Sequence, residues 1–140
     1  VGSEMCIRDR QYKVNQQRLR HETYERRLRV YKAVQAHLSI IARAGKTSYE
    51  ECTLFYSEAS EATFLFDNSV MNKIDEIYNK SIEMVGLHEQ LYPSDGSAGI
   101  PVGEERSKVS RENGELLKWH IHQLPANKEL FAKKMGMKYT

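Results

Sequence analysis

The sequence contains few of the residues that interrupt helices or cross-link a chain. Its 140 residues include only 3 Pro and 8 Gly, which excludes collagen-like and other low-complexity architectures. With only 2 Cys it cannot be a disulfide framework. It also lacks an apolar run of about 20 residues, the length that spans a membrane. The remaining composition, 40% hydrophobic and 29% charged, is typical of one helix-rich globular domain.

Apolar residues recur at steps of three and four along most of the chain, which predicts an all-α fold. Four helices are expected, over about residues 11–44, 49–65, 69–91 and from about 102 onwards. Gly45 is expected to end the first, and Thr47 and Ser48 are N-cap candidates for the second. The apolar stripe of the first is Tyr24, Leu28, Tyr31, Val34, Leu38 and Ile41, and the seam of the second is Cys52, Phe55, Ala59, Ala62 and Phe66. The third carries a seam of period 3.5, as in coiled coils, made of Val70, Ile74, Ile77, Ser81, Met84, His88 and Leu91. We therefore predict an antiparallel helical bundle of about four helices with a long first helix.

Composition also predicts how the chain divides. The apolar stripe of the first helix fades before Tyr24, so residues 11–23 are expected to form a polar helical stalk, with the bundle at 24–135. Residues 92–102 are rich in Pro and Gly and are expected to form a mobile loop. Pro125 is expected to kink or break the last helix, and residues 136–140 to fray.

Charge is distributed in three blocks along the sequence. Residues 11–44 hold eight Lys and Arg against two Glu, residues 45–105 hold three against twelve acids, and residues 106–140 hold eight against three. This basic, acidic, basic order favours antiparallel packing, in which both ends of the chain attract its middle.

The first basic block supplies the candidate contact residues. Six side chains of the first helix are candidates for contact with an anionic surface: Arg18, Arg20, Arg26, Arg27, Arg29 and Lys32. They suit either a solvated helix face, a membrane-proximal segment or a nucleic-acid patch. No nucleic-acid reader motif accompanies them.

No motif predicts catalysis, so the chain is interpreted as non-enzymatic, with no catalytic, cofactor-binding or metal-binding residues. His120 and His122 are two residues apart and point in opposite directions on a helix. Cys52 lies beside two acids, which disfavour a reactive thiolate. A hydrolase or transferase that uses the acidic middle block stays a minor hypothesis, and it requires a cleft of convergent carboxylates.

The first ten residues differ in character from the rest. Met5–Arg10 resembles the translation of an adapter used in preparing sequencing libraries, so residues 1–10 are interpreted as a non-native scar. On this interpretation the native N-terminus lies further upstream, and Cys52 is the one native cysteine, which fits a reducing compartment.

Several segments together resemble a known family. They are Gln17-Arg18-Leu19, Tyr24-Glu25-Arg26-Arg27, Leu117-Lys118-Trp119 and, most specifically, the motif Pro101, Val102, Gly103, Glu104, Glu105 and Arg106. The chain is similar to short uncharacterised bacterial proteins that have one N-terminal transmembrane helix and a helical cytoplasmic part. The resemblance implies a fold, a membrane tether and a topology, but no activity.

Charge and resemblance together lead to one functional expectation. Basic residues that flank a membrane helix stay cytoplasmic, so we expect an interaction or scaffold module on the cytoplasmic side of the inner membrane, tethered by a helix preceding Gln11. The expected partners are the anionic membrane surface and a protein, with a homo-oligomer left open and no small-molecule substrate. The alternative is a soluble nucleic-acid-associated accessory protein that uses the basic first helix.

Overall fold

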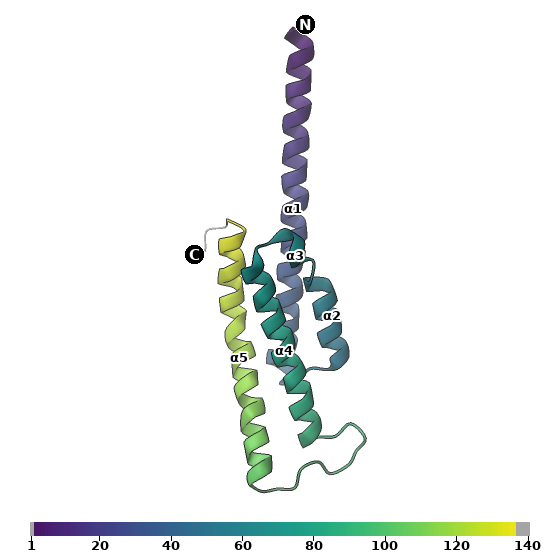
Figure 1. Ribbon diagram of the computed structural model, residues 1–140, viewed down its shortest axis with the longest axis vertical. Helices are drawn as coiled ribbons and strands as arrows, with labels where there is room; N and C mark the ends of the chain where they lie inside the picture. Colours follow the sequence, from purple (N-terminus) through teal and green to yellow (C-terminus); the bar gives the residue numbers. More distant parts are fainter. Residues whose placement is uncertain (1, 137–140) are drawn as a thin grey trace.

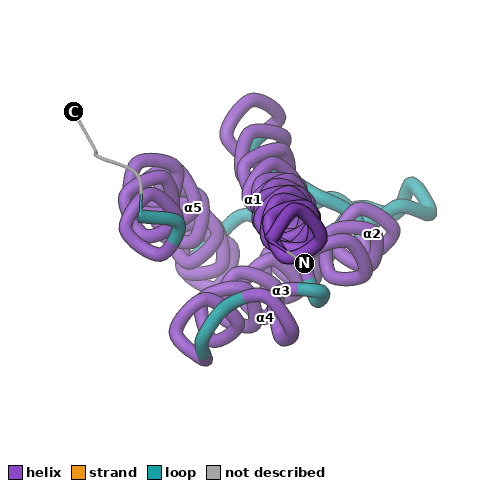
Figure 2. Tube along the Cα trace, turned by 90° about the horizontal axis from the view of Figure 1, so that it is seen from above, coloured by secondary structure: helices purple, strands orange, loops and turns teal. Residues whose placement is uncertain are grey.

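The structure is a computed structural model that describes residues 2–136, and it is an all-α antiparallel bundle (Figure 1). Its elements are α1 (Gly2–Ala44), α2 (Tyr49–Ala59), the single turn α3 (Ala62–Leu65), α4 (Asn68–Leu91) and α5 (Glu104–Lys134). Seen down the bundle in Figure 2, α1, α2, α4 and α5 surround a common centre. Each contacts two neighbours that run in the opposite direction. The predicted bundle with a long first helix is confirmed.

Local chemistry explains where the helices begin and end. Gly45 ends α1 with a φ of 70°, a conformation that glycine adopts without strain, and its N–H donates to the Ile41 carbonyl at 2.8 Å. Ser48 caps α2 by accepting from the Glu51 N–H at 3.2 Å. Asp67 caps α4 by accepting from the Ser69 N–H at 3.1 Å.

Two apolar clusters hold the bundle together. The larger one lies where α1, α2, α3, α4 and α5 all meet, and its buried members are Val30, Val34, Leu38, Phe55, Ala59, Ala62, Leu65, Val70, Ile74, Ile77 and Phe131. The smaller one joins α4 to α5 beyond the lower end of α1, through Leu87, Leu91 and Val109. The α4–α5 hairpin therefore has apolar packing of its own.

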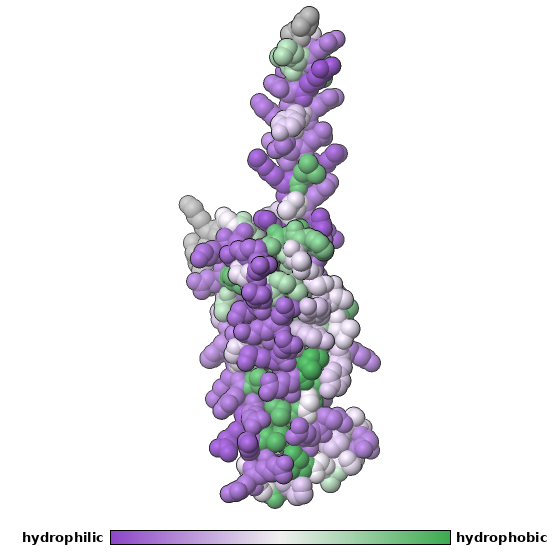
Figure 3. All heavy atoms as spheres, in the orientation of Figure 1, coloured by the Kyte–Doolittle hydropathy of each residue, from purple (hydrophilic) through white to green (hydrophobic). Residues whose placement is uncertain are grey.

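The first half of α1 stands clear of the bundle (Figure 1). Residues 3–22 are exposed apart from a half-buried Gln16, and Val30 is the first buried residue of the helix. Figure 3 shows this projection covered mainly by hydrophilic side chains. Among the described residues, no helix is both long and apolar enough to cross a bilayer.

The predicted second helix is divided in the structure. Hydrogen bonds from Thr63 to Ser60 (3.1 Å) and from Phe64 to Glu61 (2.9 Å) span three residues, which is a tighter turn than an α-helix makes. The tighter turn separates α2 from α3 and rotates the following side chains. Leu65 is buried as a result, whereas Phe66, predicted on the seam, packs against the cluster from its edge.

Two other local predictions are corrected. The seam of α4 steps from Met84 to Leu87 and not to His88, because Leu87 packs against α5 while His88 lies 5.1 Å from the Tyr92 ring. Pro125 does not break α5, which runs unbroken from Glu104 to Lys134. The proline ring is exposed, so water can satisfy the Ile121 carbonyl that has lost its helical donor. Of the predicted frayed tail, residues 137–140 lie outside the described residues.

Candidate functional site

Two of the six basic candidates are used within the fold. The Arg26 Nε donates to Glu61 Oε1 at 2.7 Å, which joins α1 to the turn before α3. The Arg27 Nε donates to the Leu65 carbonyl at 2.9 Å, and its guanidinium lies 5.3 Å from the Phe66 ring centroid. These two arginines hold α3 against the base of the projecting helix, and so they are structural.

The other four basic candidates fall into two separate groups. Arg18 and Arg20 are exposed on the projecting part of α1. Arg29 and Lys32 line an open groove between α1 and α2, together with the acidic residues Glu58 and Glu61. The six candidates therefore do not form one continuous basic patch, and acids oppose the lower pair.

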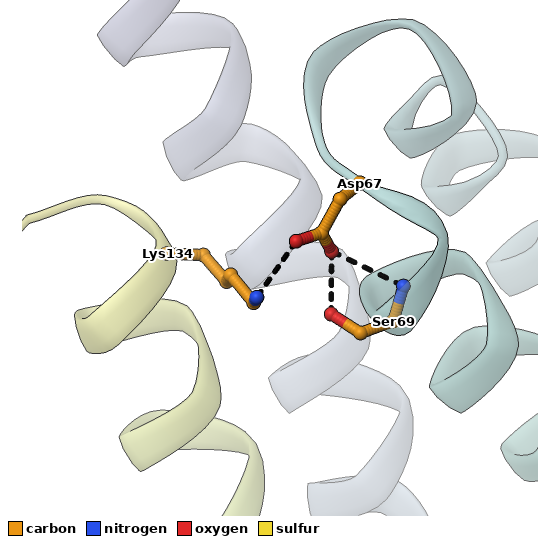
Figure 4. A network of polar contacts seen from close by, with 3 residues as sticks. All are labelled: Asp67, Ser69 and Lys134. Carbon is orange, nitrogen blue, oxygen red and sulfur yellow. Dashed lines mark hydrogen bonds and ion pairs between the residues drawn. The ribbon is translucent and has the colours of Figure 1, made fainter.

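A second ion pair joins α5 to the start of α4, at the end of the bundle from which α1 projects (Figure 4). Lys134 Nζ of α5 lies 2.7 Å from Asp67 Oδ2, and the Ser69 hydroxyl and N–H both donate to the other carboxylate oxygen. Hydrogen bonds from Lys134 and Ser69 lower the pKa of Asp67 to about 2. Like the Arg26–Glu61 pair, it joins a basic end of the chain to the acidic middle.

The family-like motif contributes one structural contact. Arg106 Nη1 donates to the Ile100 carbonyl at 2.8 Å and to the Leu91 carbonyl at 3.3 Å, and its guanidinium lies 5.3 Å from the Tyr92 centroid. The other five motif residues, Pro101, Val102, Gly103, Glu104 and Glu105, are exposed, Val102 with 96% of its surface in solvent. Arg106 therefore holds the loop before α5 against the C-terminus of α4.

Gly99 lies against the backbone at the end of α4, and this close approach predicts the effect of a substitution on stability. Its φ is +68°, and an added Cβ would lie 2.6 Å from the Leu91 carbonyl oxygen and 2.9 Å from that of Gln90. Gly96 has a φ of +82° with open space around it. Alanine at either site costs about 1–2 kcal/mol for the left-handed backbone. In urea unfolding, Gly99→Ala is expected to destabilise clearly more than Gly96→Ala, and equal losses would contradict the close approach.

A buried polar cluster lies in the middle of the bundle. The Ser81 Oγ of α4 lies 2.9 Å from His37 Nε2 of α1 and 3.1 Å from His120 Nε2 of α5. All three residues are buried, and the His37 ring stacks on Phe55 of α2 at 4.3 Å. His120 Nδ1 lies 2.7 Å from the Leu116 carbonyl. Three helices thus contribute to one polar contact inside an apolar core, and α2 covers it with an aromatic ring.

Burial decides the charge of this cluster. Desolvation, aided by the neighbouring His120, lowers the pKa of His37 to about 4. Desolvation also lowers the pKa of His120, with a smaller contribution from the charge of Lys80. Both imidazoles are therefore neutral at pH 7.

The sequence identified only parts of this cluster. Periodicity places Ser81 on the α4 seam, and the spacing of His120 and His122 excludes a shared metal on a regular helix, but His37 is not among the residues that the sequence predicts. A signal for His37 existed, because it lies on the apolar stripe between Val34 and Leu38. Nothing in the sequence, however, indicated that it would meet a residue 44 positions away.

Among residues 2–136 the structure forms no metal-binding cluster and no cleft of buried carboxylates. Within the described chain, no three His, Cys, Asp or Glu residues lie close enough to hold a metal ion. None of the acidic side chains in residues 2–136 is buried, so the cleft of carboxylates that the hydrolase hypothesis requires is not formed there. Burial raises the pKa of the Cys52 thiol, which makes it a poor nucleophile.

No protein-family model matches the chain, and neither curated proteins nor solved structures include a detectable relative.

Proposed function

We propose that this chain is a non-enzymatic interaction module on the cytoplasmic side of the inner membrane, tethered by a helix that precedes Gln11. The observation that carries the proposal is the part of α1 that projects from the bundle beyond the first ten residues, a mostly exposed polar helix over residues 11–22 (Figure 1). A helix without tertiary contacts contributes nothing to the core, but it suits a spacer between a membrane and a folded domain.

The length of the spacer limits which basic residues can meet the membrane. An α-helix rises 1.5 Å per residue, so with an upright stalk Arg26 would lie roughly 22 Å beyond Gln11. Screening at physiological salt reduces electrostatic attraction over about 8 Å. Lys13 and Arg18 are then the residues closest to the lipid headgroups, while the bundle is held off the surface.

The tether is tested by the coding sequence upstream of Gln11. We expect an apolar run of about 20 residues there, since that length spans the hydrocarbon core. A native upstream sequence without such a run would overturn the tether. A genomic copy that encodes residues 1–10 without the adapter would overturn the scar interpretation.

Surface attraction is tested by binding to vesicles of phosphatidylcholine and phosphatidylglycerol. Each Lys or Arg near an anionic surface contributes up to about 1 kcal/mol, so Lys13→Ala with Arg18→Ala is expected to weaken binding about 30-fold at low salt. The matched control, Arg29→Ala with Lys32→Ala, is expected to change binding little, because Glu58 and Glu61 face that pair.

Equal weakening by the two double variants would contradict this assignment. Steeply salt-dependent binding to an oligonucleotide, lost equally in both variants, would favour the nucleic-acid alternative.

A further inference from the structure

The buried cluster of His37, Ser81 and His120 connects the lower part of α1 to α4 and α5. We propose that it is a pH-sensitive latch, which holds the last turns of α1 in the bundle at neutral pH and releases them on acidification. The proposal rests on hydrogen-bond geometry and not on the membrane tether, so the two can fail separately.

At neutral pH one arrangement of protons satisfies the contacts of this cluster. A carbonyl can only accept, so His120 Nδ1 carries the proton that it donates to Leu116. His120 Nε2 is then an acceptor, and the Ser81 hydroxyl, which also donates to the Ile77 carbonyl at 2.7 Å, can share its proton with it. The Ser81 oxygen in turn accepts from His37 Nε2–H. Each hydrogen bond has one donor and one acceptor.

Two added protons cannot be accommodated in the same way. The first can enter at His120 Nε2, because the Ser81 hydroxyl can turn to the Ile77 carbonyl 2.7 Å away. The second must enter at His37 Nδ1, because His37 Nε2 already carries the proton that it donates to Ser81. Both rings would then be positive while pointing at a single serine oxygen. Desolvation of the charged rings and the repulsion between two like charges both favour opening.

The surroundings offer no compensating charge. From α2 the nearest contact to His37 is the Phe55 ring, nearly parallel to it at 7°, so the in-plane N–H groups cannot point at the ring face. From α4, the ammonium of Lys80 disfavours a charged His120. From α5, His120 disfavours a charged His37. In the described part of the chain, no carboxylate pairs with either imidazole, and the lowered pKa values of both histidines agree with this.

The arrangement of the other contacts makes the release local. At the stalk end, α1 is held by the Arg26–Glu61 pair and by the packing of Phe131, and α5 by the Lys134–Asp67 pair. Across residues 33–44 of α1, no described ion pair joins the helix to a neighbour, and beyond the cluster its hydrogen bonds to α5 come from Gln35, to the Leu124 carbonyl and from Asn127. The lower α4–α5 hairpin keeps its own apolar cluster. Acidification is therefore expected to free the end of α1 and the start of α2 first.

Amide hydrogen exchange at pH 7 and pH 5, corrected for the intrinsic rate, tests the latch on the full chain. With a folded pKa of about 4 and an open-state pKa of 6.5, His37 alone should increase opening about 20-fold over this range. The increase is expected at residues 34–44 and 49–55 and not at residues 62–74. An equal increase at every amide would indicate global acid unfolding and would overturn the latch, as would no increase.

Variants separate the titration from the packing. His37→Gln keeps an N–H for Ser81 but cannot be protonated, so it is expected to remove most of the pH dependence of exchange. His122→Gln is the matched control, because that side chain is exposed. An unchanged 20-fold increase in His37→Gln would overturn the proposal. If that variant does not fold, histidine NMR of the unmodified chain decides: a His37 signal that titrates near pH 6.5 without exchange changes contradicts it.

Discussion

Phe131→Ala is expected to lower the free energy of unfolding by about 3–5 kcal/mol, the range for removing a buried aromatic ring. The Phe131 ring is 1% exposed and lies between two other rings, with centroids 5.3 Å from Tyr31 and 5.1 Å from Phe66. Alanine would leave a cavity where α1, α5 and the residues after α3 meet. Denaturant unfolding monitored by circular dichroism measures the loss.

The same substitution at Phe64 is the matched control. Phe64 is 83% exposed on α3, so Phe64→Ala removes an equal side chain with almost no burial. A surface change of this kind is expected to stay within about 0.5 kcal/mol. Similar losses for the two variants would contradict the packing of α5 against α1, and with it the bundle topology.

Acidification from pH 7 to pH 4 is expected to lower the free energy of unfolding by about 3 kcal/mol through the protonation of His37 alone. The folded pKa of His37 is lowered to about 4 from an ordinary 6.5, so the unfolded chain binds more protons between these values. The stabilising contribution of a neutral His37 is thus fully present above pH 6.5 and is lost as the pH falls towards 4. His120 acts in the same direction, since its pKa is lowered too.

Asp67 adds a second and separate pH window. Its pKa is lowered to about 2 from 3.8, so its contribution is present above pH 3.8 and is lost as the pH falls towards 2. Urea unfolding at constant ionic strength is expected to show two decreases. His37→Gln should reduce the fall in the free energy of unfolding between pH 6.5 and 4. Asp67→Asn should reduce the fall between pH 3.8 and 2. A free energy of unfolding that does not change between pH 6.5 and 4 would contradict the prediction. It would show that the imidazoles take up protons in the folded chain as readily as in the unfolded one.

Patterns local in the sequence predicted most of the helices. Three- and four-residue periodicity depends only on which side chains share a helix face, so it indicated Val34, Leu38, Ile74 and Ile77 as core residues before any packing was known. Caps are local too, and the Gly45 stop and the Ser48 cap are both found in the structure. The basic, acidic and basic order also predicted that the ends of the chain attract its middle, and the pairs Arg26–Glu61 and Lys134–Asp67 agree with that order.

The sequence by itself therefore determined the fold class, the long first helix and the order of the charged blocks, because each depends on neighbours within a few residues or on composition. Only the tertiary structure decided how each side chain is used. The sequence predicted Arg26 and Arg27 as surface charges, but both contact residues at the ends of α3. The sequence predicted His88 on the α4 seam, but Leu87 is buried there because α5 packs against that face. The buried His37–Ser81–His120 contact joins three helices, and such a meeting is set by helix rotation and register, which no local pattern encodes.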